Sequence, residues 1–181
     1  MSDNTELNIE KLKETDEQSL GTQQLIVFRQ GSEEYGLHID QIKEVVLTPN
    51  ITKMPQTPNY VKGVANIRGN IIGIIDLEEK FGIKEATTTE EANKASNYTL
   101  VVESDEFKVG ILVTEVPNTL SVNSADMEHS VNIVHDNNVN SDYIQGIVKL
   151  ENRLIILIDI FKVLNEQELE TVASAASVGA N

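Results

Sequence analysis

Cysteine is absent from this chain of 181 residues, and long apolar runs are missing as well. Without cysteine the chain has no disulfide framework, no thiolate zinc site and no cysteine nucleophile. The longest apolar stretches, NIIGIIDL and LIILIDI, are far too short to span a bilayer. Residues 1–20 are polar and acidic, unlike a secretory signal. We therefore expect a cytoplasmic protein that does not insert directly into the membrane.

Positive charge is scarce. The chain has 14 lysine and arginine residues against 29 aspartate and glutamate residues, for a formal net charge of −15. Such an acidic surface repels phosphate backbones and gains nothing from counterion release, so we expect no nucleic-acid partner. Protein partners with basic patches remain open, and solubility alone explains the same charge equally well.

Signatures of catalysis and of nucleotide binding are also missing from the sequence. There is no G-x-x-x-x-G-K-[ST] loop, no G-x-G-x-x-G loop and no G-x-S-x-G elbow. We therefore expect no cofactor and no enzymatic activity.

What the chain does contain is an internal repeat. Residues 60–77 read YVKGVANIRGNIIGIIDL, and residues 143–160 read YIQGIVKLENRLIILIDI, without a gap between the copies. The identical pairs are Tyr60/Tyr143, Gly63/Gly146, Ile72/Ile155, Ile75/Ile158 and Asp76/Asp159. Most other positions exchange one aliphatic residue for another. The repeat predicts one supersecondary unit used twice, and hence two similar lobes.

Both copies have the composition of β-strands. Ile, Val and Leu dominate, and turn residues separate the apolar runs. IIGII and LIILI are apolar at nearly every position, so both faces of these strands are covered. A parallel sheet needs crossover helices between its strands, and the sequence shows no helical pattern long enough for one. This favours two small barrels. The predicted organisation is an acidic leader (1–21), a first lobe (about 22–83), a second lobe (about 97–164), a C-terminal helix (about 165–173) and a frayed tail (174–181).

Three polar residues carry helix N-capping signals. Asp76 is followed three residues later by Glu79, Asn165 is followed by Glu168, and Asp159 occupies the place of Asp76 in the second copy. Two equivalent aspartates in two β lobes also suggest an aspartic-protease dyad. Neither has the Thr-Gly or Ser-Gly context typical of those enzymes, and capping explains both.

The histidines give a weak metal hypothesis. His38 lies in an apolar strand, where packing is the simpler interpretation. Asp126, His129 and His135 could gather around a metal, but no helical or strand-paired spacing preorganises them. We therefore interpret that segment as a polar loop and expect no metal site.

The two copies differ most at one corner. Asn66-Ile-Arg68-Gly69-Asn70 in the first copy corresponds to Lys149-Leu-Glu151-Asn152-Arg153 in the second. Gly69 allows a tight turn, and Arg68 would project a planar group with several donors from it. Arg68 could bind a carboxylate on a partner or in the same chain, or it could be a solvated turn residue.

The segments QQLIVFRQGSEEYGLHIDQIKEVV, ITKMPQTPNYVKGVANIRGNIIGIIDLEEKFG and DYIQGIVKLENRLIILIDIFKVLN resemble the CheW-like domain family, over about residues 22–173. The resemblance implies a mainly β fold of two pseudo-symmetric five-stranded SH3-like β-barrels with short helices and a C-terminal helix. It also implies a non-enzymatic adaptor that joins the cytoplasmic tips of chemoreceptors to the regulatory domain of the histidine kinase CheA. An adaptor in another pathway, such as surface motility or second-messenger control, is the alternative.

The resemblance further implies which residues contact the partners. Arg68, Ile42, Glu44 and Gly63 match positions implicated in receptor binding, with the receptor tip in a groove between the lobes. Glu44 and Lys62 match positions implicated in kinase binding. Kinase contact is expected near residues 36–46 and 60–75.

Overall fold

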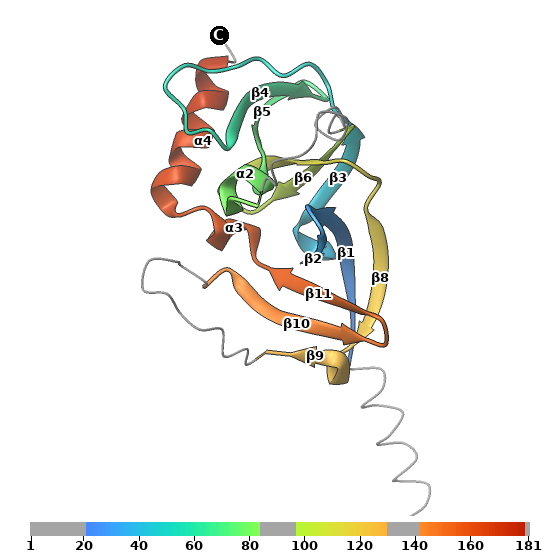
Figure 1. The fold of residues 1–181 in the computed structure, drawn as a ribbon. Coiled ribbons are helices and arrows are strands. Elements are labelled where there is room, and N and C mark those ends of the chain that lie inside the picture. The colour runs from blue at the N-terminus through green and yellow to red at the C-terminus, as the bar shows by residue number, and fades with distance from the viewer. Residues whose placement is uncertain (1–20, 84–96, 130–141, 180–181) are drawn as a thin grey trace, which may run out of the picture.

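The structure is a computed structural model that describes residues 21–83, 97–129 and 142–179, and it contains two β-sheets (Figure 1). The A sheet consists, in spatial order, of β8 (Asn118–Asn123), β1 (Thr22–Gln30), β2 (Glu33–His38), β11 (Arg153–Ile158), β10 (Ile144–Leu150) and β9 (Met127–Glu128). The B sheet consists of β3 (Ile42–Leu47), β6 (Tyr98–Glu103), β7 (Lys108–Val113), β5 (Asn70–Ile75) and β4 (Val61–Ile67). The predicted mainly β fold of two barrel-like lobes is confirmed, with the two-residue β9 as an additional strand of the A sheet.

Short helices connect the strands. They are η1 (Ile39–Gln41), α2 (Leu77–Phe81), η2 (Ser124–Asp126) and α3 (Ile160–Val163), followed by the longer C-terminal helix α4 (Glu166–Gly179). No helix in the described ranges has the length and apolar character needed to cross a membrane.

The lobes are not consecutive segments of the chain, so the predicted division into residues 22–83 and 97–164 is wrong. β1 and β2 belong to the A sheet, whereas β3, β4 and β5 of the same predicted lobe belong to the B sheet. Parallel pairing of β2 with β11, and of β5 with β7, joins the first hairpin of each copy to the second hairpin of the other. A sequence repeat could not reveal this exchange, because the same apolar patterns satisfy pairing within a copy and between copies.

The repeated hairpins nevertheless have the same local geometry. The register shifts between Val61 and Gly63 in β4, and between Ile144 and Gly146 in β10. After each hairpin, the N–H of the capping aspartate donates to the carbonyl of the repeated tyrosine, at 2.8 Å in both copies. The identical residues of the repeat therefore stabilise the same bulge and the same corner twice.

Each repeated strand has two buried faces, as the sequence predicted. Ile72 and Ile74 point into the interior of the B lobe, and their counterparts Ile155 and Leu157 point into the interior of the A lobe. On the opposite face, Ile75 and Ile158 join one large core shared by the two lobes. Apolar residues at nearly every position thus serve two cores at once.

The predicted N-caps are confirmed. The Asp76 carboxylate accepts hydrogen bonds from the N–H groups of Glu78 and Glu79, at 2.9 and 3.3 Å. Asp159 accepts from the Phe161 N–H at 3.0 Å. Such contacts satisfy the orphan donors at a helix start.

Helix α4 begins as predicted but ends later. Asn165 and Glu168 form a reciprocal capping box with two bonds of 2.8 Å. The sequence predicts a helix end at about residue 173 and a frayed tail from 174, but the helix continues through 174–179. Ala175 is 7% exposed, so burial of this small side chain accompanies the extra turns.

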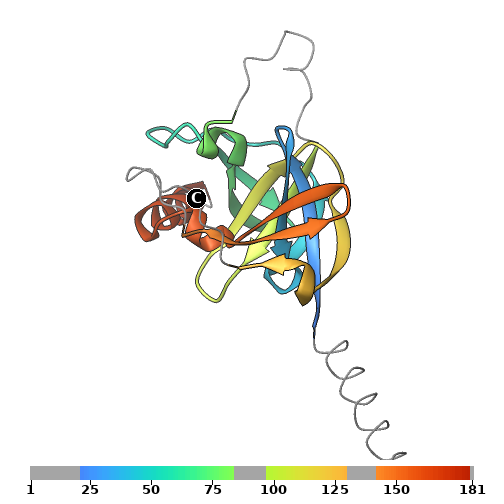
Figure 2. The same cartoon turned by 60° about the horizontal axis from the view of Figure 1, so that its bottom comes forward.

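Helix α4 packs against β4 and β5 of the B lobe, on the flank of the molecule opposite β8 (Figures 1 and 2). Gly73 in β5 provides the room, because a Cβ there would overlap the Val172 side chain. Leu169 and Val172 are buried in the shared core. The C-terminal segment of the second copy is therefore fixed to the lobe that contains the β4–β5 hairpin of the first copy.

Candidate functional site

The turn between β4 and β5 consists of only two residues, Arg68 and Gly69. Their φ angles are +52° and +85°. A two-residue hairpin turn with both φ angles positive matches the right-handed twist of the flanking strands. The Gly69 N–H donates to the Asn66 side chain at 2.9 Å. Glycine adopts this conformation freely, whereas arginine does so at a cost, so Arg68 is held in an unfavourable conformation at the tip of the hairpin.

The structure brings Arg68 and Glu44 together. The Arg68 guanidinium forms an ion pair with the carboxylate of Glu44 on β3, and the Arg68 side chain is 73% exposed. β3 and β4 are the two ends of the B sheet in its strand order, so the pair spans the two edges of the lobe. An exposed pair of this kind contributes only about 0–1 kcal/mol. A carboxylate on a partner can therefore replace Glu44 at little cost.

Ile42 lies on the same strand as Glu44, two positions earlier. It is half-buried and packs against the shared core. It also borders an open hollow of about 490 Å³. The other lining residues come from η1, from β3 and from the end of β6 with the turn that follows; they are Asp40, Gln41, Lys43, Glu103, Ser104 and Asp105. Ile42 is thus an apolar side chain at the edge of a polar, largely acidic hollow.

The residues at the bulge of β4 are engaged within the molecule. Lys62 forms an ion pair with Glu79 of α2, and its Nζ lies 3.8 Å from Asp76. Gly63 is buried with φ +138°, and a Cβ there would overlap the backbone oxygen of Thr52. Thr52 and Val64 exchange two backbone hydrogen bonds across this point. Gly63 therefore lies beneath the chain at Thr52 and affects the surface through the conformation of that chain.

Two apolar side chains on β3 were not identified from the sequence. Val45 is 39% exposed and Leu47 is 72% exposed. They alternate with Glu44 and Val46, which face the other side of the strand. The signal in the sequence was the apolar run Val45-Val46-Leu47, which puts apolar side chains on both faces of a strand. Exposed apolar side chains next to a charged pair are typical of protein interfaces.

A polar cluster joins the start of β4 and helix α2 to the C-terminal helix α4. The Tyr60 hydroxyl donates to the Glu168 carboxylate at 2.9 Å, and Lys80 forms an ion pair with the same carboxylate. The Lys80 ammonium also lies 4.6 Å from the centre of the Tyr60 ring. Burial and the hydrogen bond to Glu168 raise the pKa of Tyr60 well above its usual value. The tyrosine therefore stays protonated and acts as a donor.

The catalytic and metal hypotheses receive no support from the geometry. Asp76 and Asp159 cap helices, as described above. His38 is half-buried at the end of β2, and His129 is exposed; His135 lies outside the described residues. Within the part of the chain that the structure describes, no group of three or more His, Asp or Glu side chains could hold a metal ion.

Comparisons with known proteins identify the family of the chain. The family model described as "CheW-like domain" matches residues 24–168 of the chain. The chain is 34% identical over 143 residues to a chemotaxis protein CheW from Helicobacter pylori, covering 79% of this chain and 82% of the relative. It is 31% identical over 158 residues to a chemotaxis protein CheW from Klebsiella aerogenes, covering 85% and 89%.

A solved structure is similar over the same extent. The crystal structure of the scaffolding protein TtCheW from Thermoanaerobacter tengcongensis matches with a TM-score of 0.67 and 28% identity. The match covers 81% of this chain and 94% of that chain. The sequence and structural comparisons therefore indicate the same relationship.

Proposed function

Because the chain belongs to the CheW-like domain family, we propose that it is a non-enzymatic adaptor of chemotaxis signalling. In this role it couples the cytoplasmic tips of chemoreceptors to the regulatory domain of the histidine kinase CheA. Two kinds of evidence support the proposal. The relatives above are chemotaxis proteins, and one solved relative is a scaffolding protein. Binding to receptor arrays would hold the protein at the inner face of the membrane.

The observation that carries the proposal is the exposed Arg68–Glu44 pair. Arg68 stands at the tip of a strained turn, and the corresponding turn of the second copy has Glu151 and Asn152 instead. A core or a turn alone does not require an arginine there. Its planar guanidinium suits a carboxylate on a receptor helix, and Ile42, two positions before Glu44 on β3, supplies an apolar contact.

Kinase binding would use the neighbouring outer surface of the B lobe. Val45 and Leu47 provide exposed apolar area on β3, and Glu44 of β3 and Lys62 of β4 provide charge. An apolar centre with a charged rim favours specific but moderate affinity. Moderate affinity suffices in an array, because many linked copies raise the effective concentration.

The test is receptor control of kinase activity in a reconstituted mixture of receptor, kinase and adaptor. Arg68→Ala should fold normally and weaken receptor control. Arg153→Ala is the matched control, because Arg153 adjoins the equivalent turn of the other hairpin and pairs with Glu34 at 2.8 Å. If the receptor controls the kinase equally well with Arg68→Ala and with the wild-type adaptor, Arg68 is only a solvated turn residue. Binding to a kinase of another pathway, and not to CheA, would favour the alternative adaptor role.

A further inference from the structure

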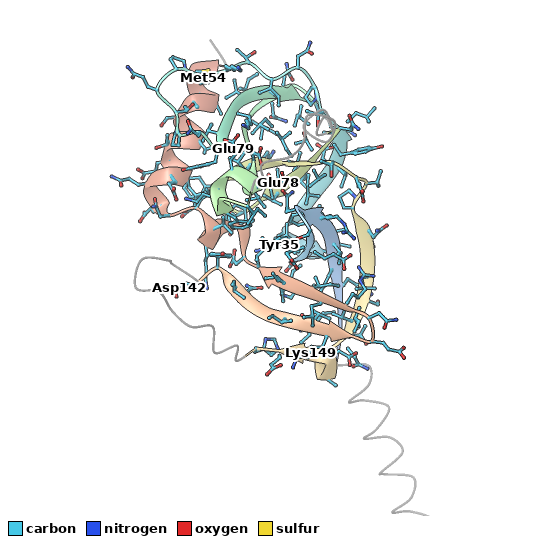
Figure 3. The ribbon with its side chains drawn as sticks, in the orientation of Figure 1. Tyr35, Met54, Glu78, Glu79, Asp142 and Lys149 are labelled. Atoms are coloured by element: carbon cyan, nitrogen blue, oxygen red, sulfur yellow. The ribbon has the colours of Figure 1, made fainter. Side chains whose placement is uncertain are left out.

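Helix α2 has only five residues, yet each of its last four side chains contacts a different part of the molecule. Figure 3 labels Glu78 and Glu79 on this helix, and Tyr35 below them where the two lobes meet. The contacts are Glu78 with Gly31 after β1, Glu79 with Lys62 of β4, Lys80 with Glu168 of α4, and Phe81 with Tyr35 and Tyr143 of the A sheet region.

Two of these contacts hold the corner of the B lobe where Lys62 lies. Glu79 binds the Lys62 ammonium, and Lys80 binds Glu168 next to the Tyr60 ring. The side chains of these ion-paired groups are only 21–30% exposed. Partial burial and shared partners make such a network more rigid than isolated surface pairs.

The other two contacts reach across to the A lobe. The Gly31 N–H donates to Glu78 at 2.9 Å. The Phe81 ring stacks between Tyr35 and Tyr143, with ring centres 5.4 and 5.3 Å apart. Burial raises the pKa of both tyrosines, which therefore stay neutral in the stack. Offset stacking of this kind fixes orientation as well as contributing stability.

The second copy shows that the fold itself does not require these contacts. The equivalent helix α3 keeps its capping aspartate, but Phe161, Lys162 and Val163 stand where α2 has Glu78, Glu79 and Lys80. Val163 is buried in the shared core, in place of the ion-paired Lys80. The polar and aromatic contacts of α2 are thus specific to the lobe with the candidate binding surface.

We propose that α2 fixes the Lys62 corner of the partner-binding surface relative to the A lobe, with Glu78 and Phe81 as positioning residues that touch no partner. That this corner belongs to a partner-binding surface rests on the proposed function. Because the contacts of α2 follow one another on a single short helix, loosening one of them shifts the whole corner. Phe81 controls the position of Lys62 through the helix, not through direct contact.

The first test needs no partner. In NMR spectra of the full chain, Phe81→Leu should shift the signals of Lys62 and Gly63, and Phe81→Tyr should restore them by restoring the stacked ring. Phe107→Leu is the matched control, because Phe107 is also a half-buried ring at the edge of the shared core. Unmoved Lys62 and Gly63 signals in a folded Phe81→Leu variant would overturn the positioning role.

The second test measures affinity for the regulatory domain of CheA from the same genome. Phe81→Leu should weaken binding roughly twofold to thirtyfold, the range found for mutations within coupled networks. Phe81→Tyr and Phe107→Leu should bind like wild type. If Phe81→Leu binds this domain with wild-type affinity, the Lys62 corner is not part of the interface. Absence of binding by the wild type would instead refute the proposed function, and the spectra would still decide whether α2 positions Lys62.

Discussion

Arg68 combines exposure, strain and charge at a single position. Its positive φ angle suits glycine or asparagine better than arginine. A Cβ atom crowds the following carbonyl oxygen there, glycine has none, and asparagine compensates with local hydrogen bonds. Strain of this kind is commonly retained at binding sites. The arginine is therefore better explained by what its guanidinium binds than by the turn it occupies.

This explanation predicts opposite effects of Arg68→Asn on stability and on function. Asn-Gly is the preferred sequence for such a turn, so the free energy of unfolding should rise by about 1 kcal/mol. Receptor control of the kinase should fall, because asparagine cannot replace the guanidinium. Urea denaturation and the reconstituted kinase assay measure the two effects. A variant that is more stable and couples normally would contradict a binding role for Arg68.

Gly63 and Gly69 are conformationally similar but differ in their surroundings. Both have positive φ, yet a Cβ at Gly63 would overlap the Thr52 backbone, whereas nothing lies within 4 Å of one at Gly69. Gly63→Ala should therefore destabilise the protein by about 3 kcal/mol or more, and Gly69→Ala by about 1 kcal/mol. Thermal unfolding of the two variants gives the comparison. Similar losses would mean that the chain at Thr52 moves aside easily.

At the scale of elements, α4 stabilises the B lobe through close packing on β5. Gly73→Ala should be destabilising, because its methyl group would overlap Val172. Val172→Ala should cost about 1–3 kcal/mol through lost burial. The double variant should be more stable than the sum of the two losses implies, with a coupling of about 0.5–3 kcal/mol. Additive losses in a double-mutant cycle would show that α4 does not need the glycine.

The start of α4 should make stability depend on pH. Burial alone would raise the pKa of the Glu168 carboxyl, but hydrogen bonds from Lys80 and from the Asn165 backbone outweigh it, so the pKa lies below its usual value. A carboxyl with a lowered pKa in the folded state contributes stability above the pKa of the unfolded chain, about 4.3. That contribution is lost as the pH falls through the lower folded value.

Glu168→Gln should therefore be less stable than wild type at neutral pH, and the difference should shrink as the pH falls from about 5 to 3. Glu170→Gln is the control, because Glu170 is exposed on the same helix and carries the same charge. Urea denaturation across this range provides the measurement. A constant difference between wild type and Glu168→Gln would show that the ionised carboxylate contributes nothing.

At the scale of the whole molecule, local patterns were predictable and the connections between them were not. Repeated apolar runs, capping residues and the Arg68-Gly69 turn each depend on neighbours in the sequence, and the structure has them where they were expected. The exchange of hairpins between lobes depends on pairing of distant strands, for which the chain has no local signal. The A lobe is therefore made from both ends of the chain, and the B lobe from its middle with α4 packed on it.

For the candidate site, the family resemblance named both Arg68 and Glu44 as receptor positions. The structure pairs them with each other, a contact between distant strands that no local pattern predicts. The contacts of α2 were missed, although the difference between Glu78-Glu79-Lys80 and Phe161-Lys162-Val163 was visible in the aligned copies. The capping signal at Asp76 predicts the helix, and a comparison of the two copies beyond the repeated hairpin points to its distinct side chains.

The central claim is that the molecule is an adaptor, which acts by binding. The most direct measurement is calorimetric titration of the full chain with the purified C-terminal regulatory domain of CheA from the same genome. We expect a one-to-one complex with micromolar or tighter affinity, about −8 kcal/mol or more favourable. Absence of binding at concentrations well above that affinity would contradict the claim and assign the protein to a different signalling system.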